Sequence, residues 1–339
     1  MTLVRERRHQ QALRLALPPP SPSTDRKQRT HLPALSPATS PDSPCIENLS
    51  ELEKLAVLGH GNGGTVYKVC HKKTSLVYAL KVLRFNHNAI ANRQQAAREA
   101  EILKLVDSPY IIRCHGVLDN GLMDEDSGGD LCFLMEYMEE GSLHDMLRAR
   151  QRLPEQVIAS VARRVLQGLE YLHGMQIVHR DIKPSNLLIN GRGEVKIADF
   201  GVSDVVAGTC ETCDSYMGTC AYMSPERFDP ERWGRDGSDG FAGDVWSLGV
   251  VVLQCHMGRF PLIGPGQRPD WTTLMCVISF GERLDMPETA SAEFQSFVSA
   301  CLEKDWRKRA TVAELLHHPF VDTSYCSSAE DLIDYVLHG

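Results

Sequence analysis

The chain has 339 residues, and its contents of 42% hydrophobic and 24% charged residues are ordinary for a globular protein with an ample core. The formal net charge of −8 is unevenly spread, because residues 1–45 carry seven Arg or Lys against three Asp or Glu, a local charge of +4. A basic segment on an acidic body argues against nucleic acid as the main ligand. The longest apolar run, near SLGVVVLQC, is far shorter than the ~20 residues that a membrane span requires.

Eleven cysteines occur at irregular spacings, and no apolar signal region follows the start of the chain. The disulfide framework of a secreted protein is therefore not expected, and a reducing compartment fits better. We expect an intracellular protein of the cytoplasm, with the nucleus open as a second location.

Residues 1–48 hold eight of the eighteen prolines and show no sustained apolar periodicity. This composition predicts a disordered, Pro/Ser-rich tail. An ordered region begins near Leu52, where LEKLAVLGHGNGGTVYKVCHKKTSLVYALKVL predicts three strands joined by a Gly-rich turn and a polar turn.

The Gly-rich turn has Gly59, Gly61 and Gly64 in the spacing of a phosphate-binding loop. A strand rather than a helix follows, which excludes the dinucleotide-binding version of this motif. The third strand carries Lys81, a cation placed to meet phosphate oxygens. The next segment, NRQQAAREAEILKLV, has helical spacing and contains Glu99, which can aim that lysine and make catalysis switchable.

The acidic stretch DNGLMDEDSGGD predicts a surface loop between two further strands, the second of which is LCFLMEYM. From Pro154 onward helices dominate, beginning with the long amphipathic PEQVIASVARRVLQGLEYLHGM. A later helix, TVAELLHHPF, opens with a capping box formed by Thr311 and Glu314. The predicted fold class is α+β, with a small β-rich lobe followed by a larger helical lobe.

Two short motifs in the helical part have chemical roles: HRDIKPSN and, thirteen residues after its asparagine, DFG. Mg²⁺ prefers hard oxygen ligands, which Asn186 and Asp199 supply together with phosphate oxygens. Asp181 can orient an attacking hydroxyl and accept its proton, and Lys183 can neutralise charge on a transferred phosphoryl group.

With these motifs in this order, residues 52–320 resemble the eukaryotic protein kinases. The segments SPE, DVWSLG and DWRKRAT agree, and the resemblance implies that Arg309 is the buried partner of Glu226. The bilobal fold that it implies has an N-lobe, a hinge, a C-lobe and a short C-terminal extension, at 52–135, 136–139, 140–320 and 321–339.

The ligands implied by the resemblance are ATP and Mg²⁺. Met135 is the expected gatekeeper beside the adenine, a role that also makes it part of the core. The residues expected to contact ATP lie on the first strands, on the following helix and at the hinge: Leu58, Gly59, Gly61, Gly64, Val66, Ala79, Lys81, Glu99, Met135, Glu136 and Met138.

KPSN resembles the serine/threonine branch, and GTCAYMSPER resembles the MAP kinase kinases, which phosphorylate both Thr and Tyr in MAP kinase activation loops. In plant members of that family five residues separate the two phosphorylated hydroxyls, as they separate Thr209 from Ser215. The animal spacing of three would leave only one hydroxyl in each pair. An upstream MAP kinase kinase kinase is therefore expected to phosphorylate both residues, and Arg180 is within reach to order the loop. Thr219 is expected to be structural, and Thr212 has no assigned role.

Cys210 and Cys213 have the spacing of half a zinc or dithiol site. A zinc site needs four ligands, and no second pair accompanies them, so metal binding is not expected. Oxidation of these two thiols, which would inhibit the neighbouring phosphorylation loop, stays open as a hypothesis.

The start of the tail, RERRHQQALRLAL, combines arginines with alternating leucines. Leucines two apart point the same way in an extended chain, so they can enter apolar pockets while the arginines meet an acidic patch. This resembles the motif by which MAP kinase kinases dock on their MAP kinases. A transit peptide is the alternative, although Glu6 and the early prolines count against it. The expected docking residues are Arg5, Arg7, Arg8, Leu13 and Leu15.

The expected function is that of a MAP kinase kinase. A serine/threonine kinase outside the MAP kinase cascade and a kinase-fold scaffold without catalysis are the alternatives. The sequence leaves open the downstream MAP kinase, the upstream kinase, the stimulus and the oligomeric state.

Overall fold

A computed structural model describes residues 46, 48–61, 64–85, 90–120, 130–201, 204–205, 221–233, 239–264, 271–281, 286–322 and 335. All of these residues fall within the unit Asp42–Gly339. The predicted tail and most of the predicted acidic loop at 119–130 lie outside them.

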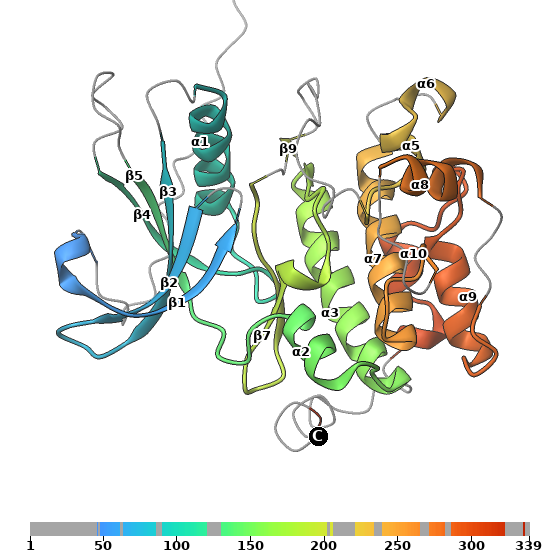
Figure 1. The fold of residues 1–339 in the computed structure, drawn as a ribbon, viewed down its shortest axis with the longest axis horizontal. Coiled ribbons are helices and arrows are strands. Elements are labelled where there is room, and N and C mark those ends of the chain that lie inside the picture. The colour runs from blue at the N-terminus through green and yellow to red at the C-terminus, as the bar shows by residue number, and fades with distance from the viewer. Residues whose placement is uncertain are drawn as a thin grey trace, which may run out of the picture. The chain divides into compact units, whose positions relative to one another are not determined.

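Five antiparallel strands form the sheet of the first lobe, in the order β1-β2-β3-β5-β4 (Figure 1). Their bounds are Leu52–Gly61 for β1, Gly64–His71 for β2, Val77–Arg84 for β3, Cys114–Asn120 for β4 and Asp130–Glu136 for β5. The three strands predicted around the Gly-rich turn and the two predicted around the acidic loop are thereby confirmed.

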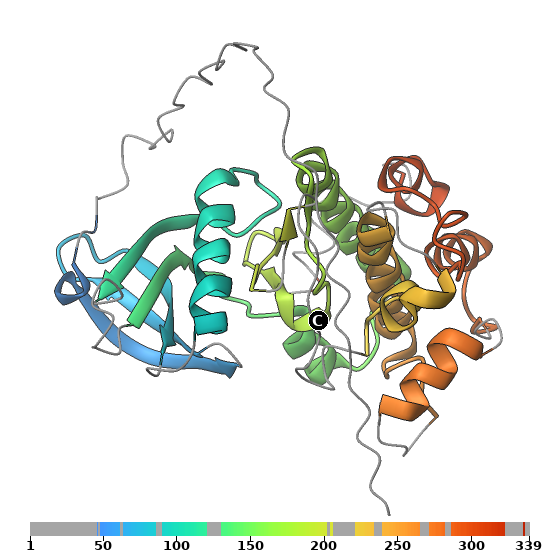
Figure 2. The ribbon, with the colours of Figure 1, turned by 90° about the horizontal axis from the view of Figure 1, so that it is seen from above.

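The two faces of this sheet have different partners, because alternate residues of a strand point to opposite sides. Leu80 and Leu134 lie opposite each other on one face, where Leu49 of the 3₁₀ helix η1 (Leu49–Glu51) packs against their cluster. On the other face, Phe133 lies in the same core cluster as Ala96 and Ala100 of helix α1 (Ile90–Leu105). Figures 1 and 2 both show α1 on the side of the sheet that faces the second lobe.

Gly64 begins β2 at a position that only glycine fits. Its φ is +154°, and a Cβ there would lie 1.9 Å from the carbonyl oxygen of Val82 on the neighbouring strand. Gly64 pairs with Gly61 across the turn, so this close approach brings the Gly-rich hairpin down onto β3.

The second lobe is built mainly from helices. Its α-helices are α2 (Leu143–Arg150), α3 (Glu155–Gly174), α5 (Pro225–Phe228), α6 (Pro230–Trp233), α7 (Asp239–Met257), α8 (Trp271–Met275), α9 (Ala292–Cys301) and α10 (Val312–Leu316). Shorter helical turns are η2 (Pro184–Asn186), η3 (Cys276–Phe280) and η4 (Pro319–Val321).

Helix α7 lies between α3 and α9 and contacts both of them (Figure 1). The amphipathic helix predicted after Pro154 is α3, whose Val161, Val165 and Leu169 are buried. The capping box predicted at Thr311 and Glu314 opens α10. Both predictions are confirmed.

The contact between α7 and α9 is unusually close at Gly249. A Cβ at this position would lie 2.6 Å from the Cβ of Cys301 and 2.9 Å from the Cδ2 of Leu302. Glycine therefore sets the distance between these two helices.

Arg309 and Glu226 form the buried pair that the family resemblance implies. The Nη1 and Nη2 atoms of Arg309 donate to the two carboxylate oxygens of Glu226 at 2.7 and 2.9 Å, and both side chains are 0% exposed. Arg309 also donates to the carbonyl oxygens of Ala242 and Glu303, so most of its donors are satisfied inside the lobe.

Four short strands lie where the two lobes meet. They are β6 (Ile177–Val178), β7 (Leu187–Ile189), β8 (Val195–Ile197) and β9 (Asp204–Val205). β7 pairs with β8, and β6 pairs with β9. The α+β fold class, with a β-rich first lobe and a helical second lobe, is confirmed. Within the part of the chain that the structure describes, no helix is both long and apolar enough to cross a membrane.

Candidate active site

The β7–β8 hairpin brings two polar residues to the same place. Asn186 directly precedes β7, Asp199 follows β8 by two residues, and the pairing of Leu187 with Ile197 closes the hairpin at this end. The N–H of Ala198 donates to the carbonyl oxygen of Asn186 at 2.8 Å. An antiparallel hairpin thus explains how residues thirteen positions apart share one site.

Lys81 joins three segments of the chain. Its Nζ lies 2.7 Å from Oε1 of Glu99 on α1 and 2.8 Å from Oδ1 of Asp199 in the second lobe. The side chains are 13% exposed for Lys81, 4% for Glu99 and 46% for Asp199, so this contact is buried on the α1 side and open on the Asp199 side.

The charged groups of this cluster shift one another's pKa values. Burial would lower the pKa of Lys81, but the carboxylates of Asp199 and Glu99 raise it well above its usual value, so the ammonium stays charged. Desolvation works to raise the pKa of Asp199, yet the attraction of Lys81 lowers it on balance. For Glu99 burial prevails over Lys81 and raises the pKa.

Asp181 lies at the centre of a second group of contacts. Lys183 Nζ lies 2.8 Å from its Oδ2, and the amide nitrogen of Asn186 donates to the same oxygen and to the Asp181 carbonyl, both at 2.9 Å. Burial raises the pKa of Asp181, while the nearby charge of Lys183 works to lower it. This carboxylate is therefore more basic than an ordinary aspartate.

The donor set at the end of the hairpin fits a hard divalent cation. Because the amide nitrogen of Asn186 serves Asp181, its carbonyl oxygen is the atom left to ligate a metal. Lys81 occupies Oδ1 of Asp199, and no bond from a described residue reaches its Oδ2. No group of three or more His, Cys, Asp or Glu side chains in the described ranges could hold a metal alone. A cation here would complete its ligands with phosphate and water.

Asp244 holds the backbone of the segment that precedes Asp181. Its carboxylate accepts the backbone N–H groups of His179 and Arg180 at 2.9 and 2.7 Å, and Nε2 of His173 lies 3.0 Å from it. Burial would raise the pKa of Asp244, but its bond to His173 lowers it on balance. The DVWSLG segment indicates Asp244 in the sequence, whereas no pattern indicates His173 as its partner.

The expected nucleotide contacts lie on one face of the sheet. Val66 pairs with both Gly59 and Lys81, and Ala79 pairs with Met135, so these side-chain positions share the face that bears Lys81. Leu58, at a break in the β1–β2 register, is an exposed apolar residue beside them. A Cβ on Gly59 would meet nothing within 4 Å, which indicates open space above the turn.

The hinge is held to the second lobe by Glu136, the last residue of β5. Lys196 Nζ donates to its two carboxylate oxygens at 2.9 and 2.7 Å, and the N–H of Arg113 donates to Oε1 at 2.6 Å. Met138 is buried in a cluster with Ala198. The sequence predicts Glu136 as a hinge residue but gives no sign that its carboxylate anchors β8.

The comparisons with known proteins agree with this geometry. Residues 52–321 match the protein kinase domain model. The chain is 55% identical to mitogen-activated protein kinase kinase 10 of Arabidopsis thaliana, over 95% of the chain and 99% of that protein. It is 51% identical to mitogen-activated protein kinase kinase 9 of the same plant, with the same coverage. The chain belongs to the plant-type MAP kinase kinases.

This family assignment confirms the resemblance seen in the sequence. A MAP kinase kinase is a dual-specificity phosphotransferase, and protein kinases use ATP and a divalent metal. A third relative, mitogen-activated protein kinase kinase 7 of Arabidopsis thaliana, is 49% identical over 96% of the kinase and 100% of that protein. The similarity thus extends well beyond the catalytic motifs.

Several predicted residues of the kinase lie outside the described residues. They include the two hydroxyls expected to be phosphorylated, the neighbouring residues of that loop and the docking segment: Thr209, Cys210, Thr212, Cys213, Ser215, Thr219, Arg5, Arg7, Arg8, Leu13 and Leu15.

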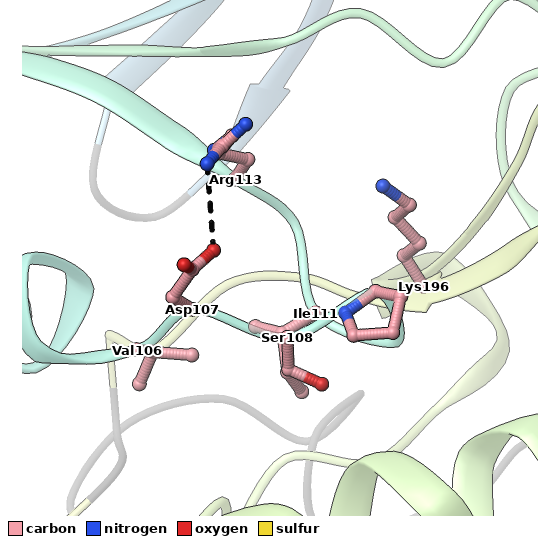
Figure 3. Close-up of a pocket in the computed structure, with 7 residues that line it drawn as sticks. Val106, Asp107, Ser108, Ile111, Arg113 and Lys196 are labelled. Carbon is pink, nitrogen blue, oxygen red and sulfur yellow. Dashed lines mark ion pairs between the residues drawn. The ribbon is translucent and has the colours of Figure 1, made fainter. Parts of the chain in front are cut away.

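A pocket of about 250 Å³ lies between the turn after α1 and β8 (Figure 3). Arg113 and Lys196 line it together with the turn after α1, and Arg113 points toward Asp107 at 3.5 Å. None of the residues expected to contact ATP lines this pocket. Two residues that line it, Arg113 and Lys196, are the ones that donate to Glu136.

Proposed function

We propose that this kinase transfers the γ-phosphoryl group of ATP to a Thr and a Tyr in the activation loop of a MAP kinase, with Mg²⁺ as its metal. The observation that carries this proposal is the continuous contact from Glu99 through Lys81 to Asp199, at 2.7 and 2.8 Å. That contact aligns α1, the sheet and the second lobe in one arrangement. The substrate class is supported by the names of its relatives.

The nucleotide would lie beneath the Gly-rich hairpin, with its phosphates against Lys81. The hairpin offers backbone N–H groups, and Gly64 keeps it close to β3. Lys81 is charged, and its hydrogen bond to Glu99 already orients its side chain, so it can bind phosphate oxygens without rearrangement. Leu58, Val66, Ala79, Met135 and Met138 would surround the adenine.

Asp181 would accept the proton of the attacking hydroxyl. Its raised pKa makes it a better proton acceptor than an exposed aspartate, while Lys183, 2.8 Å away, favours its ionised form. Lys183 is also placed to stabilise negative charge on the phosphoryl group during transfer.

Asn186 and Asp199 would hold the metal. When bound, Mg²⁺ neutralises the charge of the phosphates and bridges their oxygens. The protein's own part is to fix both ligands: Asn186 through its bonds to Asp181, and Asp199 through its bond to Lys81.

Phosphorylation of Thr209 and Ser215 by a MAP kinase kinase kinase would switch the kinase on. Each phosphate adds ~1.5 to 2 negative charges and strong acceptor oxygens. Arg180 lies beside Asp181 and would bind one of them, so that ordering of the loop acts directly on the base.

The tail residues Arg5, Arg7, Arg8, Leu13 and Leu15 would dock the MAP kinase. Changing Leu13 and Leu15 to Ala should weaken capture of a MAP kinase in a pull-down, because the apolar anchors are lost while the arginines remain. Undiminished capture would show that the tail is not the docking element.

The decisive assay uses kinase carrying Thr209→Asp and Ser215→Asp, Mg-ATP and a panel of catalytically inactive MAP kinases. We expect phosphate on both the Thr and the Tyr of the activation loop of at least one of them, mapped by mass spectrometry. The control carries Lys81→Met in the same background and should transfer nothing.

Two results would contradict the proposal. Phosphate found only on other proteins, or only outside the activation loop, would place the kinase outside this cascade. Signalling output in cells that survives Lys81→Met would instead indicate a scaffold, since that change removes the phosphate clamp.

A further inference from the structure

Helix α1 presents two adjacent glutamines, Gln94 and Gln95, of which one has a contact in the second lobe. Both side chains are exposed. The side-chain nitrogen of Gln95 donates a hydrogen bond to the carbonyl oxygen of Gly201, 106 residues later in the chain. No described residue bonds to the Gln94 side chain.

The direction of this bond is fixed by chemistry. A backbone carbonyl oxygen only accepts hydrogen bonds, so the amide nitrogen of Gln95, not its oxygen, must face Gly201. Figures 1 and 2 place α1 on the side of the sheet toward the second lobe, as this contact requires.

Gln95 acts on the same segment as Glu99. The two residues are four positions apart, so they lie one turn apart on one face of α1. Glu99 holds Lys81, which holds Asp199, while Gln95 holds Gly201. The segment Asp199–Gly201 is thus attached to α1 at both of its ends.

Gly201 is packed into this cluster. Its N–H lies 3.4 Å from Oδ1 of Asp199, and a Cβ added to it would lie 3.3 Å from that oxygen and 3.6 Å from Oε2 of Glu99. A shift of Gly201 therefore cannot leave the Asp199 carboxylate undisturbed.

Asp199 also needs restraint because its backbone is unfavourable. Its φ is +67°, a left-handed value that costs any residue with a side chain some free energy, although aspartate tolerates it better than most. The bond from Gln95, two residues further along, is one such restraint.

We propose that Gln95 is a positioning residue: it fixes Gly201 to α1 and thereby keeps Asp199 oriented to bind the divalent metal. The proposal rests on the proposed function, in which Asp199 is a metal ligand. It also adds a second link through which movement of α1 would act on the site, because withdrawal of the helix breaks the Gln95 and Glu99 contacts together.

The test compares Gln95→Met with Gln94→Met in the Thr209→Asp/Ser215→Asp kinase. Met has the length and the helix propensity of Gln but donates no hydrogen bond, so helix stability is matched in both variants. We expect Gln95→Met to raise the Mg²⁺ concentration for half-maximal phosphoryl transfer about threefold to tenfold, the factor expected for one hydrogen bond. Gln94→Met should leave it unchanged.

A second measurement does not depend on catalysis. Amide hydrogen exchange of the same proteins without nucleotide should be faster over α1 and residues 198–201 in Gln95→Met, and unchanged in Gln94→Met. A role for Gln95 in helix packing alone would change exchange within α1 without moving the Mg²⁺ requirement.

The proposal requires both changes in Gln95→Met and neither in Gln94→Met, and any other pattern overturns it. If the parent kinase transfers phosphate to no protein, the proposed function fails separately. Hydrogen exchange then still decides whether Gln95 holds Gly201, and equal exchange in the two variants would overturn the contact itself.

Discussion

Specific neighbours set the protonation states of the charged side chains in the active site. Lys81 stays an ammonium because two carboxylates face it, and Asp199 stays ionised because Lys81 faces it. Burial raises the pKa of Asp181, as it does that of Glu99, and Lys183 and then His179 work to lower it. Of the residues that would contact the attacking hydroxyl, Asp181 is therefore the one whose protonation should depend on this balance.

The pH dependence of the kinase should report this balance. A base must be ionised, so the transfer rate should fall as pH drops through the raised pKa of Asp181. In Lys183→Met the loss of the positive charge removes the largest effect that lowers that pKa, and the acid limb of the pH–rate profile should move to higher pH.

Lys183→Arg is the matched control, because it keeps the charge and should keep the acid limb near its original position. The measurement is kcat against pH with an inactive MAP kinase as substrate. An acid limb that stays in place in Lys183→Met would mean that Asp181 is not the titrating base.

The buried pair of Arg309 and Glu226 gives a prediction about stability. Arg309→Met leaves the Glu226 carboxylate buried without its partner and should lower the free energy of unfolding by about 3–5 kcal/mol. The control is Arg307→Met, two residues away, which removes an exposed pair with Asp305 and should cost at most about 1 kcal/mol. Urea denaturation measures both, and equal losses would contradict the prediction.

At the scale of elements, the distances between helices depend on small residues at contacts. Gly249 of α7 lies against Cys301 and Leu302, so α9 approaches the α7 backbone itself. Gly174, the last residue of α3, has open space around its Cα instead. Both glycines are helical, which makes them a matched pair.

Gly249→Ala should destabilise the kinase by about 1–3 kcal/mol, because the added methyl overpacks the α7–α9 contact. The better helix propensity of Ala, about 1 kcal/mol, offsets part of this loss. Gly174→Ala gains that propensity without a clash and should leave the melting temperature unchanged or raise it. The measurement is thermal unfolding, and a more stable Gly249→Ala would show that α9 moves away at little cost.

For the whole molecule, polar contacts join the two lobes in addition to the apolar core cluster that they share. Lys81 binds Asp199 across the lobes, Glu136 binds Lys196, and the N–H of Ile112 donates to the carbonyl oxygen of Ile197. The nucleotide and its metal would add further bonds between the same surfaces. Ligand binding should therefore stabilise the kinase as a unit.

Mg-ATP should raise the melting temperature more than ATP in EDTA does. A ligand at 100 times its Kd adds about 2.7 kcal/mol to the free energy of unfolding. In Asp199→Asn the increment due to Mg²⁺ should disappear, while some stabilisation by ATP alone remains. A Mg²⁺ increment that survives Asp199→Asn would exclude Asp199 as a ligand.

Much of this architecture is predictable from the sequence because it is local. Strand alternation, the Gly-rich turn, the amphipathic α3 and the capping box at Thr311 each depend on residues within a few positions. The family resemblance supplies the long-range pair of Arg309 and Glu226. The MAP kinase kinase assignment follows from motifs whose order and spacing are equally visible in the sequence.

The remaining contacts are not predictable, because they depend on register between distant segments. Lys196 lies 60 residues from Glu136, and His173 lies 71 residues from Asp244. None of these contacts has a local signal, and a charged residue in a strand or helix is usually a solvated one. Gln95 is the extreme case, since it is indistinguishable in sequence from the glutamine beside it.

The left-handed backbone of Arg180 and Asp199, each at φ +67°, has an evolutionary consequence. Glycine at position 199 would adopt this backbone conformation without strain, whereas aspartate adopts it at a cost that contacts with its neighbours offset. Selection for thermal stability alone would therefore favour the loss of this side chain wherever the relief of strain exceeds the contribution of its ion pair with Lys81. In laboratory evolution for higher thermal stability, the activity of this kinase should therefore be measured in every round. A substitution that relieves the strain at Asp199 would also abolish phosphoryl transfer.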